Sequence, residues 1–245
     1  TSFADTKDST QTTTENNQSD SSSSDETSST DENNTEDDEN VLKTDDGFKY
    51  TVEDDEVTIK GYEGSKTTLT IPNEIDGKKV TKIGANAFDG NTSITSVEIQ
   101  DGITTIDSYA FYNATALESV SIPESVTTMN EGAFANCTAL SSVNLPSKLK
   151  TISYGLFASC SNLTKIEIPE GVTSIDGYAF YTCTSLKEIN IPEKVASIGE
   201  AAFYYCAALE SIEIPKSVDD IGSYAFDSCS NLTMSGYSSS AAKTY

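Results

Sequence analysis

The chain contains no histidine and few basic residues, and these two shortages exclude several classes of function. Its 245 residues include 39 acidic side chains but only 15 basic ones, for a formal net charge of −24. Without histidine the commonest general base is missing, and neither a Ser-His-Asp nor a Cys-His set can form. The sequence also lacks a glycine-rich phosphate loop with its lysine. We therefore predict that the protein is not an enzyme and uses no cofactor.

The acidic balance also excludes two kinds of partner. Nucleic-acid phosphates require a basic surface, and so do anionic membrane surfaces. No apolar run is long enough to form a signal peptide or a membrane span. We expect no nucleic-acid partner and no direct insertion of the domain into a membrane.

What the sequence does contain is a strict period, in which phenylalanine recurs at every twenty-third position. A fixed period in this range indicates one short supersecondary unit stacked on copies of itself. One unit has too few apolar side chains to fold alone, so we expect neighbouring units to share a continuous core with the phenylalanines as its spine. The phenylalanines of this column are Phe88, Phe111, Phe134, Phe157, Phe180, Phe203 and Phe226.

Each unit has the pattern of a short strand followed by a turn. In the unit that begins at Leu117, residues 119–122 alternate polar and apolar, which predicts a strand with one buried face. Pro123 removes the next backbone donor and ends that strand. The remainder, through Phe134, has a spacing suited to a tight turn and a short helical or 3₁₀ stretch. The sequence thus predicts an α/β repeat with a parallel sheet on one face and short helical or 3₁₀ segments on the other.

Composition divides the chain into four parts. Residues 1–40 hold 12 acidic residues and one lysine among Ser, Thr, Asn and Gln, so we predict a disordered acidic linker. This linker is either a spacer that lifts the domain off a cell surface or a tail without a role. Alternating residues around Asp54-Asp55 predict a capping β-hairpin over 41–65. The solenoid follows over 66–234, with an inserted hairpin at Asp76-Gly77, and 235–245 begin a C-terminal cap.

The five cysteines form a second column, three residues after the phenylalanines. Three interpretations are open: small buried hydrophobes lining the core, disulfides between adjacent units, or a metal site. With an odd number of cysteines, not all of them can pair in disulfides, and the lack of histidine argues against a metal site. We therefore favour the core interpretation. The column consists of Cys137, Cys160, Cys183, Cys206 and Cys229.

The units resemble the leucine-rich repeat proteins of the BspA-like class, a family of bacterial surface proteins. The resemblance lies in the strand, the apolar-Pro step, the isoleucine and the A-F-x-x-C motif, as in LESVSIPESVTTMNEGAF, LTKIEIPEGVTSIDGYAF and LKEINIPEKVASIGEAAF. It runs from about Phe48 to Tyr245 and includes the opening FKYTVEDDEVTIKGYEG. It implies a right-handed leucine-rich-repeat solenoid, secreted or anchored to a bacterial cell surface, with relatives linked to adhesion and host binding.

Two surfaces are candidates for recognition. The first is the outward face of the strands, where charge gathers towards the C-terminal half; the alternative is a merely solvated sheet face. We expect binding there through Lys165, Glu167, Lys187, Glu188, Asn190, Glu210 and Glu213. The second comprises tyrosines beside the phenylalanine column, which either pack between coils, since these columns are commonly aromatic in the resembling family, or contact a ligand. They are Tyr109, Tyr112, Tyr178, Tyr181, Tyr204, Tyr205 and Tyr224.

Two functions from different classes remain after these exclusions. The leading hypothesis is a non-catalytic adhesion module, a monomer that contacts a protein or glycan of a host or neighbouring cell through its strand face. The alternative is a passive spacer or display scaffold without a ligand of its own. The sequence names no ligand for either.

Overall fold

The computed structural model describes residues 40–236, which lie within one compact unit spanning Asp37–Tyr245. Almost all of the predicted linker over residues 1–40 lies outside the described residues. So do residues 237–245 of the predicted C-terminal cap.

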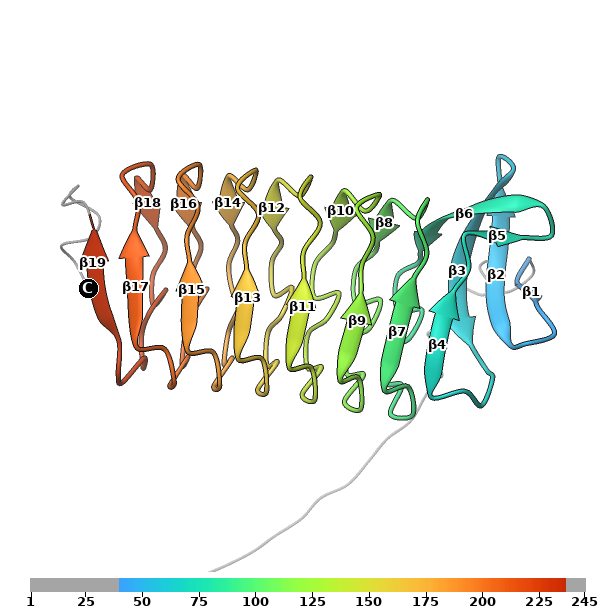
Figure 1. The fold of residues 1–245 in the computed structure, drawn as a ribbon, viewed down its shortest axis with the longest axis horizontal. Helices are drawn as coiled ribbons and strands as arrows, with labels where there is room; N and C mark the ends of the chain where they lie inside the picture. The colour runs from blue at the N-terminus through green and yellow to red at the C-terminus, as the bar shows by residue number, and fades with distance from the viewer. Residues whose placement is uncertain (1–39, 237–245) are drawn as a thin grey trace, which may run out of the picture. The chain divides into compact units, whose positions relative to one another are not determined.

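Three sheets run along a stack of coils (Figure 1). The first sheet has eight strands, all parallel, and lies in chain order: β4 (Thr68–Ile71), β7 (Ser96–Ile99), β9 (Ser119–Ser121), β11 (Ser142–Asn144), β13 (Lys165–Glu167), β15 (Glu188–Asn190), β17 (Ser211–Ile214) and β19 (Thr233–Gly236).

Two-residue strands on a second side of the coils belong to the other two sheets, and the first of these sheets also contains longer strands. This seven-stranded sheet holds β1 (Leu42–Lys43), β2 (Phe48–Glu53), β3 (Glu56–Tyr62), β5 (Glu74–Ile75), β6 (Lys78–Ile83), β8 (Thr105–Ile106) and β10 (Thr128–Met129), of which β2, β3 and β6 are the longer ones. The four-stranded sheet holds β12 (Thr151–Ile152), β14 (Ser174–Ile175), β16 (Ser197–Ile198) and β18 (Asp220–Ile221).

The register of the strands follows the sequence period. Val143 of β11 pairs with Ile166 of β13, which lies one full period later, and Ile166 pairs with Ile189 of β15. In each of these three-residue strands the central residue is buried and its two neighbours are exposed. This is the alternation that the sequence predicts, and it places every apolar side chain of the strand in the shared core. The stack of parallel coils is therefore a β-solenoid.

The spine phenylalanines stack in single file through the core. Consecutive rings from Phe88 to Phe226 have centroids 4.8 to 5.8 Å apart. Their planes are inclined by 2° to 13°, so the rings lie nearly parallel. Phe134, Phe157, Phe180 and Phe203 have no measurable exposure. Each inner ring therefore packs on one ring before it and one after it, which joins the coils into one core.

The third side of each coil is built from turns, and the predicted helical or 3₁₀ segments there are wrong for residues 40–236. No helix of either kind occurs in that part of the chain. The α/β assignment is therefore replaced by an all-β one. The two residues that lie two before and two after each spine phenylalanine adopt left-handed backbone conformations, as at Gly155 (φ 59°) and Ser159 (φ 61°).

This left-handed geometry turns alternate backbone N–H groups away from the local chain. Gly155, Phe157 and Ser159 donate to carbonyls of the following coil at 2.9, 2.9 and 2.7 Å. The intervening backbone N–H groups of Leu156 and Ala158 donate to the carbonyls of the residues three positions earlier and so close turns within the same coil. A helix requires successive amides to point the same way along the chain, so the inter-coil bonds replace it. The turns thereby form a third hydrogen-bonded ladder along the stack.

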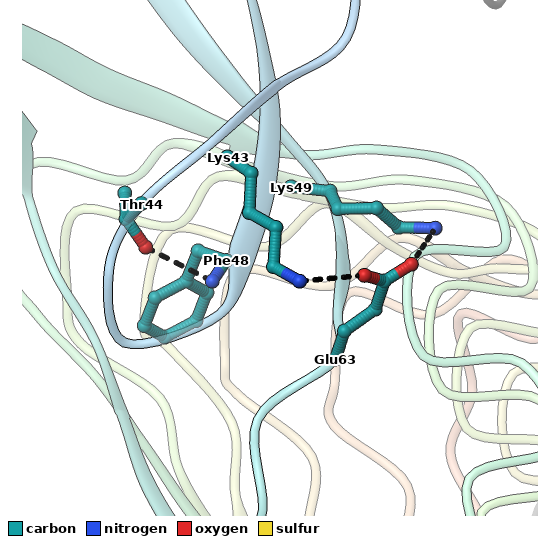
Figure 2. Close-up of polar contacts among 5 residues, drawn as sticks. All are labelled: Lys43, Thr44, Phe48, Lys49 and Glu63. Carbon is teal, nitrogen blue, oxygen red and sulfur yellow. Dashed lines mark hydrogen bonds and ion pairs between the residues drawn. The ribbon is translucent and has the colours of Figure 1, made fainter.

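An antiparallel hairpin precedes the first coil. β2 pairs with β3 through a turn at Asp54 and Asp55, both of which have positive φ, and β3 continues the sheet by pairing with β6. Directly after β3, Glu63 accepts a hydrogen bond from Lys43 of β1 at 2.8 Å and lies 3.2 Å from Lys49 of β2; Figure 2 shows both contacts. The hairpin covers the apolar end of the stack, where Phe48 and Tyr50 are buried.

Candidate recognition surface on the strand face

The outward side chains of β13, β15 and β17 form the charged part of the strand face. Lys165, Glu167, Glu188, Asn190 and Glu213 are all exposed and alternate with the buried residues Ile166, Ile189 and Ile212. Because the coils are in register, side chains from adjacent strands stand side by side, Lys165 next to Glu188 and Glu167 next to Asn190. The parallel sheet thus gathers charges that are a whole repeat apart in sequence.

A hollow of about 570 Å³ lies over this part of the sheet and opens to solvent. Its lining includes Lys165, Glu167, Glu188, Asn190 and Glu213, five of the residues predicted for binding. Lys187 and Glu210 do not line it; they are exposed one residue before β15 and β17, on the flank of the face. The structure therefore brings five predicted residues together and leaves two beside them.

One ammonium group, that of Lys165, stands among the carboxylates around the hollow. The Nζ atom of Lys165 lies 3.4 Å from a carboxylate oxygen of Glu167 and 3.8 Å from one of Glu188. Asn190 stands in the column between Glu167 and Glu213, so these two carboxylates are not direct neighbours. All three members of the ion-pair group are largely exposed, and such pairs add little to folding stability. Their charges remain available to a partner.

The chemistry of this surface is polar. It offers carboxylates, one ammonium group, the Asn190 amide and the Ser211 hydroxyl, while the apolar residues beside them point into the core. Nothing in the lining of the hollow resembles an aromatic anchor, and the N-terminal half of the same face presents mainly serines such as Ser119 and Ser142. Such a surface suits a ligand recognised by hydrogen bonds and charge, with weak single contacts that are strengthened by multivalency.

Two further residues line the hollow that sequence reasoning missed, Glu170 and Ser235. Glu170 belongs to the link after Pro169. This link lies outside the strand, so the alternation of side chains along a strand does not predict which way Glu170 points. Paired residues of neighbouring strands from β7 to β17 are one full repeat apart in the sequence. Ser235 of β19 lies one residue less than a full repeat after its partner, Glu213 of β17. The alternation of polar and apolar residues in Thr233-Met234-Ser235 could have predicted that Ser235 points outward.

The cysteines take no part in this surface. All five are free, and Cys137, Cys160, Cys183 and Cys206 are buried in the core. Burial raises the pKa of Cys137 and of Cys183 to about 12. Among residues 40–236 no group of three or more His, Cys, Asp or Glu side chains could hold a metal ion. The same residues include no helix long and apolar enough to cross a membrane.

In-register parallel strands, an aromatic spine and a short fixed repeat define a leucine-rich-repeat solenoid. The family model described as BspA type leucine rich repeat region matches the chain in 6 copies, over residues 62–166 and 150–244. The chain therefore belongs to the BspA-type leucine-rich repeat family.

Solved structures of bacterial proteins share this fold. The chain is 26% identical to the leucine-rich repeat protein of Treponema pallidum, with a TM-score of 0.74, and the match covers 78% of this chain and 91% of that one. It is 32% identical to a leucine-rich cell surface protein from Faecalibacterium prausnitzii, with a TM-score of 0.71, over 80% of this chain and 54% of that one.

A third similarity is to the pneumococcal vaccine antigen PcpA, at 16% identity and a TM-score of 0.53, over 80% of this chain and 69% of that one. This last likeness shows the fold alone. Comparison with curated protein sequences finds no match.

Proposed function

We propose that the protein is a non-catalytic binding module, displayed on or secreted from a bacterial cell, whose strand face recognises a surface protein or glycan of a host or neighbouring cell. The observation that carries this proposal is the hollow over β13, β15, β17 and β19, lined by exposed charged and amide side chains. A face with only a structural role requires no such gathering of charge, and the N-terminal half of the same sheet lacks it.

Two further observations support the proposal. The F. prausnitzii relative is described as a cell surface protein, which fits a location outside the cell. The open face of a stacked solenoid is also the surface that repeat proteins commonly use to bind partners. The opposed charges Lys165 and Glu188 favour a partner that itself carries both hydrogen-bond donors and acceptors.

The test is a variant in which Lys165, Glu167, Glu188 and Glu213 are all replaced by Ser. Labelled wild-type protein and variant are applied to a printed array of host glycans and surface proteins. We expect wild type to be retained on specific spots and the variant to lose that retention. Thermal stability should hardly change, because exposed substitutions away from caps and core shift it by about 0.5 kcal/mol or less.

A matched control replaces Lys150, Glu74, Asp219 and Asp220 by Ser. These residues are exposed and lie off the strand face, and the control changes the net charge by the same amount as the test variant. It should bind like wild type. Equal loss in both variants would show that retention depends on net charge alone, and no retention of wild type on any spot would favour a passive spacer.

A further inference from the structure

A second exposed surface runs along the turn side of the coils and is rich in tyrosine. We define the turn face as the four residues on either side of each spine phenylalanine together with that phenylalanine, for example residues 107–115. Most of the chain's 12 tyrosines fall on it: Tyr109, Tyr112, Tyr154, Tyr178, Tyr181, Tyr204, Tyr205 and Tyr224.

Several of these tyrosines occupy backbone positions that suit other residues better. Tyr109, Tyr178, Tyr205 and Tyr224 have φ between 56° and 60°, the left-handed region in which bulky side chains are rare. The chain itself uses less strained residues in the same columns, such as Gly155 in place of Tyr178. The repeat imposes this conformation on both columns, as at Thr182 and Ala201, and backbone strain of this kind gathers at functional sites.

Core packing does not explain the choice. Tyr224 is 60% exposed, Tyr205 49% and Tyr154 48%, which makes them three of the most exposed large hydrophobic residues in the described chain. The Tyr109 ring does cover Gly132, where an added Cβ would collide with it, so that tyrosine has a packing role. For Tyr205 and Tyr224 the described residues show no comparable one.

Four of the rings form a connected row over three successive coils, and Tyr224 lies on the coil that follows them. Tyr154 and Tyr178 have centroids 5.3 Å apart, Tyr178 and Tyr181 also 5.3 Å, and Tyr181 and Tyr204 5.2 Å. The last pair is stacked, with planes inclined by 11°. A linear ligand could therefore meet one aromatic ring after another along the stack.

The charge of the turn face excludes an anionic ligand. None of its residues is a lysine, and the one lysine ammonium that reaches it, from Lys82, is paired with Asp107. Its ionisable side chains other than tyrosine and cysteine are acidic: Asp89, Asp107, Glu131, Asp176, Glu200 and Asp227. The negative charge of Glu200 raises the pKa of the Tyr178 hydroxyl, and Glu200 is exposed, so its carboxylate lies near that ring. Acceptors thus stand directly beside the rings, ready for hydroxyl donors.

We propose that this tyrosine row is a binding surface for a neutral, unbranched glycan chain, separate from the charged strand face. The weakly positive C–H groups on a sugar face complement the negative face of an aromatic ring. The sugar hydroxyls then donate to carboxylates such as Glu200 and Asp227. Rigid tyrosines supply contact area at little loss of conformational entropy, which suits a ligand bound by many small contacts.

The test uses neutral hexasaccharides of four kinds, namely cellohexaose, laminarihexaose, mannohexaose and chitohexaose. The chain has no tryptophan, so its emission comes from tyrosine, and most of its 12 tyrosines lie on the turn face. A change in emission on titration that is lost in the tyrosine variant reports on these rings. The variant carries Tyr178→Gly, Tyr205→Asn and Tyr224→Gly, which are residue types that the chain already places in the same columns. We expect at least one hexasaccharide to bind wild type, and the variant to bind it at least about tenfold more weakly.

Stability separates this result from a folding defect. Glycine and asparagine adopt the left-handed conformation readily, so the variant should melt no lower than wild type. The strand-face variant described above should bind the hexasaccharide like wild type, which keeps the two surfaces distinguishable.

Three outcomes would overturn the proposal. One is no binding of any of the four hexasaccharides to wild type. Another is equal binding by wild type and the tyrosine variant. The third is tyrosine-dependent binding of a decaproline peptide without binding of the sugars, which would assign the row to an extended polypeptide instead.

Discussion

The Sγ atom of Cys160 donates a hydrogen bond to the backbone carbonyl of Phe134, 26 residues earlier, at 3.1 Å. That carbonyl also accepts the backbone N–H of Cys137, at 3.3 Å. Cys183 repeats the arrangement with Phe157, at 3.2 Å. The cysteine column thus links each coil to the spine of the one before it, and its thiols are satisfied donors inside the core.

Thiol reactivity should differ along the column. Cys229 is only partly buried, whereas Cys160 is fully buried and its burial raises its pKa. With a disulfide reagent at neutral pH, we expect Cys229 to react first and the other four thiols to react only after unfolding in denaturant. Rapid reaction of Cys160 in the native protein, or fewer than the 5 thiols after unfolding, would contradict this assignment.

The same cysteines should make the protein less stable at alkaline pH. Cys137 and Cys183 have pKa values raised from 9.0 to about 12 in the folded chain by burial. Their contribution to stability is complete below pH 9 and is lost as the pH rises towards 12, because the unfolded thiols ionise first. Urea unfolding at pH 8 and pH 10.5 measures the loss.

The matched control for that experiment is the double variant Cys137→Ala, Cys183→Ala. Alanine already holds this column at Ala114, so the substitution fits a coil of this shape. The fall in stability with pH should be shallower in the variant than in wild type. An identical slope in both would show that tyrosines and lysines account for the whole effect.

Truncation of the spine should be most harmful at its centre. Phe157→Ala removes a fully buried ring that stacks on Phe134 and on Phe180, both at 5.8 Å. We expect a loss of about 3–5 kcal/mol in the free energy of unfolding. Phe88→Ala, at the first coil, removes a ring that stacks on one spine neighbour, Phe111, and should lose less. Urea denaturation compares the two, and an unchanged midpoint for Phe157→Ala would refute the role of the spine.

Close contact between coils should make some glycines irreplaceable. A Cβ added at Gly199 would collide with the backbone nitrogen of Gly177 in the preceding coil, whereas one at Gly90 meets nothing within 4 Å. Gly199→Ala should therefore destabilise the chain by about 1–3 kcal/mol or more, as overpacking does. Gly90→Ala should lower the free energy of unfolding by only about 1 kcal/mol, which is the cost of placing alanine at a φ of +66°. Equal melting temperatures for the two variants would contradict this difference.

The hairpin in front of the first coil should loosen at low pH. Lys43 and Lys49 lower the pKa of Glu63 by hydrogen bonding and by their charge. A lowered folded-state pKa adds stability above the ordinary pKa of glutamate, near 4.5, and this stability is lost as the pH falls. Amide exchange at β1 should be faster in Glu63→Gln than in wild type at pH 7. The difference should vanish once the pH falls below the lowered pKa of Glu63, and also in 1 M salt, because the ion pairs are exposed.

Much of the fold was predictable because the repeat supplies several copies of each column. The buried positions of β11, β13 and β15 follow from alternation alone, and the β-solenoid with parallel sheets is confirmed. The helical segment was mispredicted because the residues of a single unit do not indicate that two of its positions have a left-handed backbone conformation. The column that holds Tyr109 also holds Gly132 and Gly155, and a comparison down that column would have revealed the conformation.

The candidate surface was predictable only in part. The outward direction of Lys165, Glu167 and Glu188 follows from the strand period, and the structure places all three around one hollow. The hollow itself depends on the path of the link at Glu170 and on the changed step at Ser235, neither of which the period specifies. The sequence also provides no measure of how far Tyr205 and Tyr224 stand out from the turns.

The hydrogen-bonded ladders make the length of this molecule adjustable in whole units. Each coil presents the next with the same donors and acceptors, as the repeated bonds of Phe134, Phe157 and Phe180 to the following turn show. A tandem duplication of one repeat in the gene would add a coil that finds its contacts already in place. Such an event lengthens the protein by one strand spacing, about 4.8 Å, and carries one more row of side chains to both faces. Recombination among the repeats can therefore change the reach and the valency of the protein without redesigning its core.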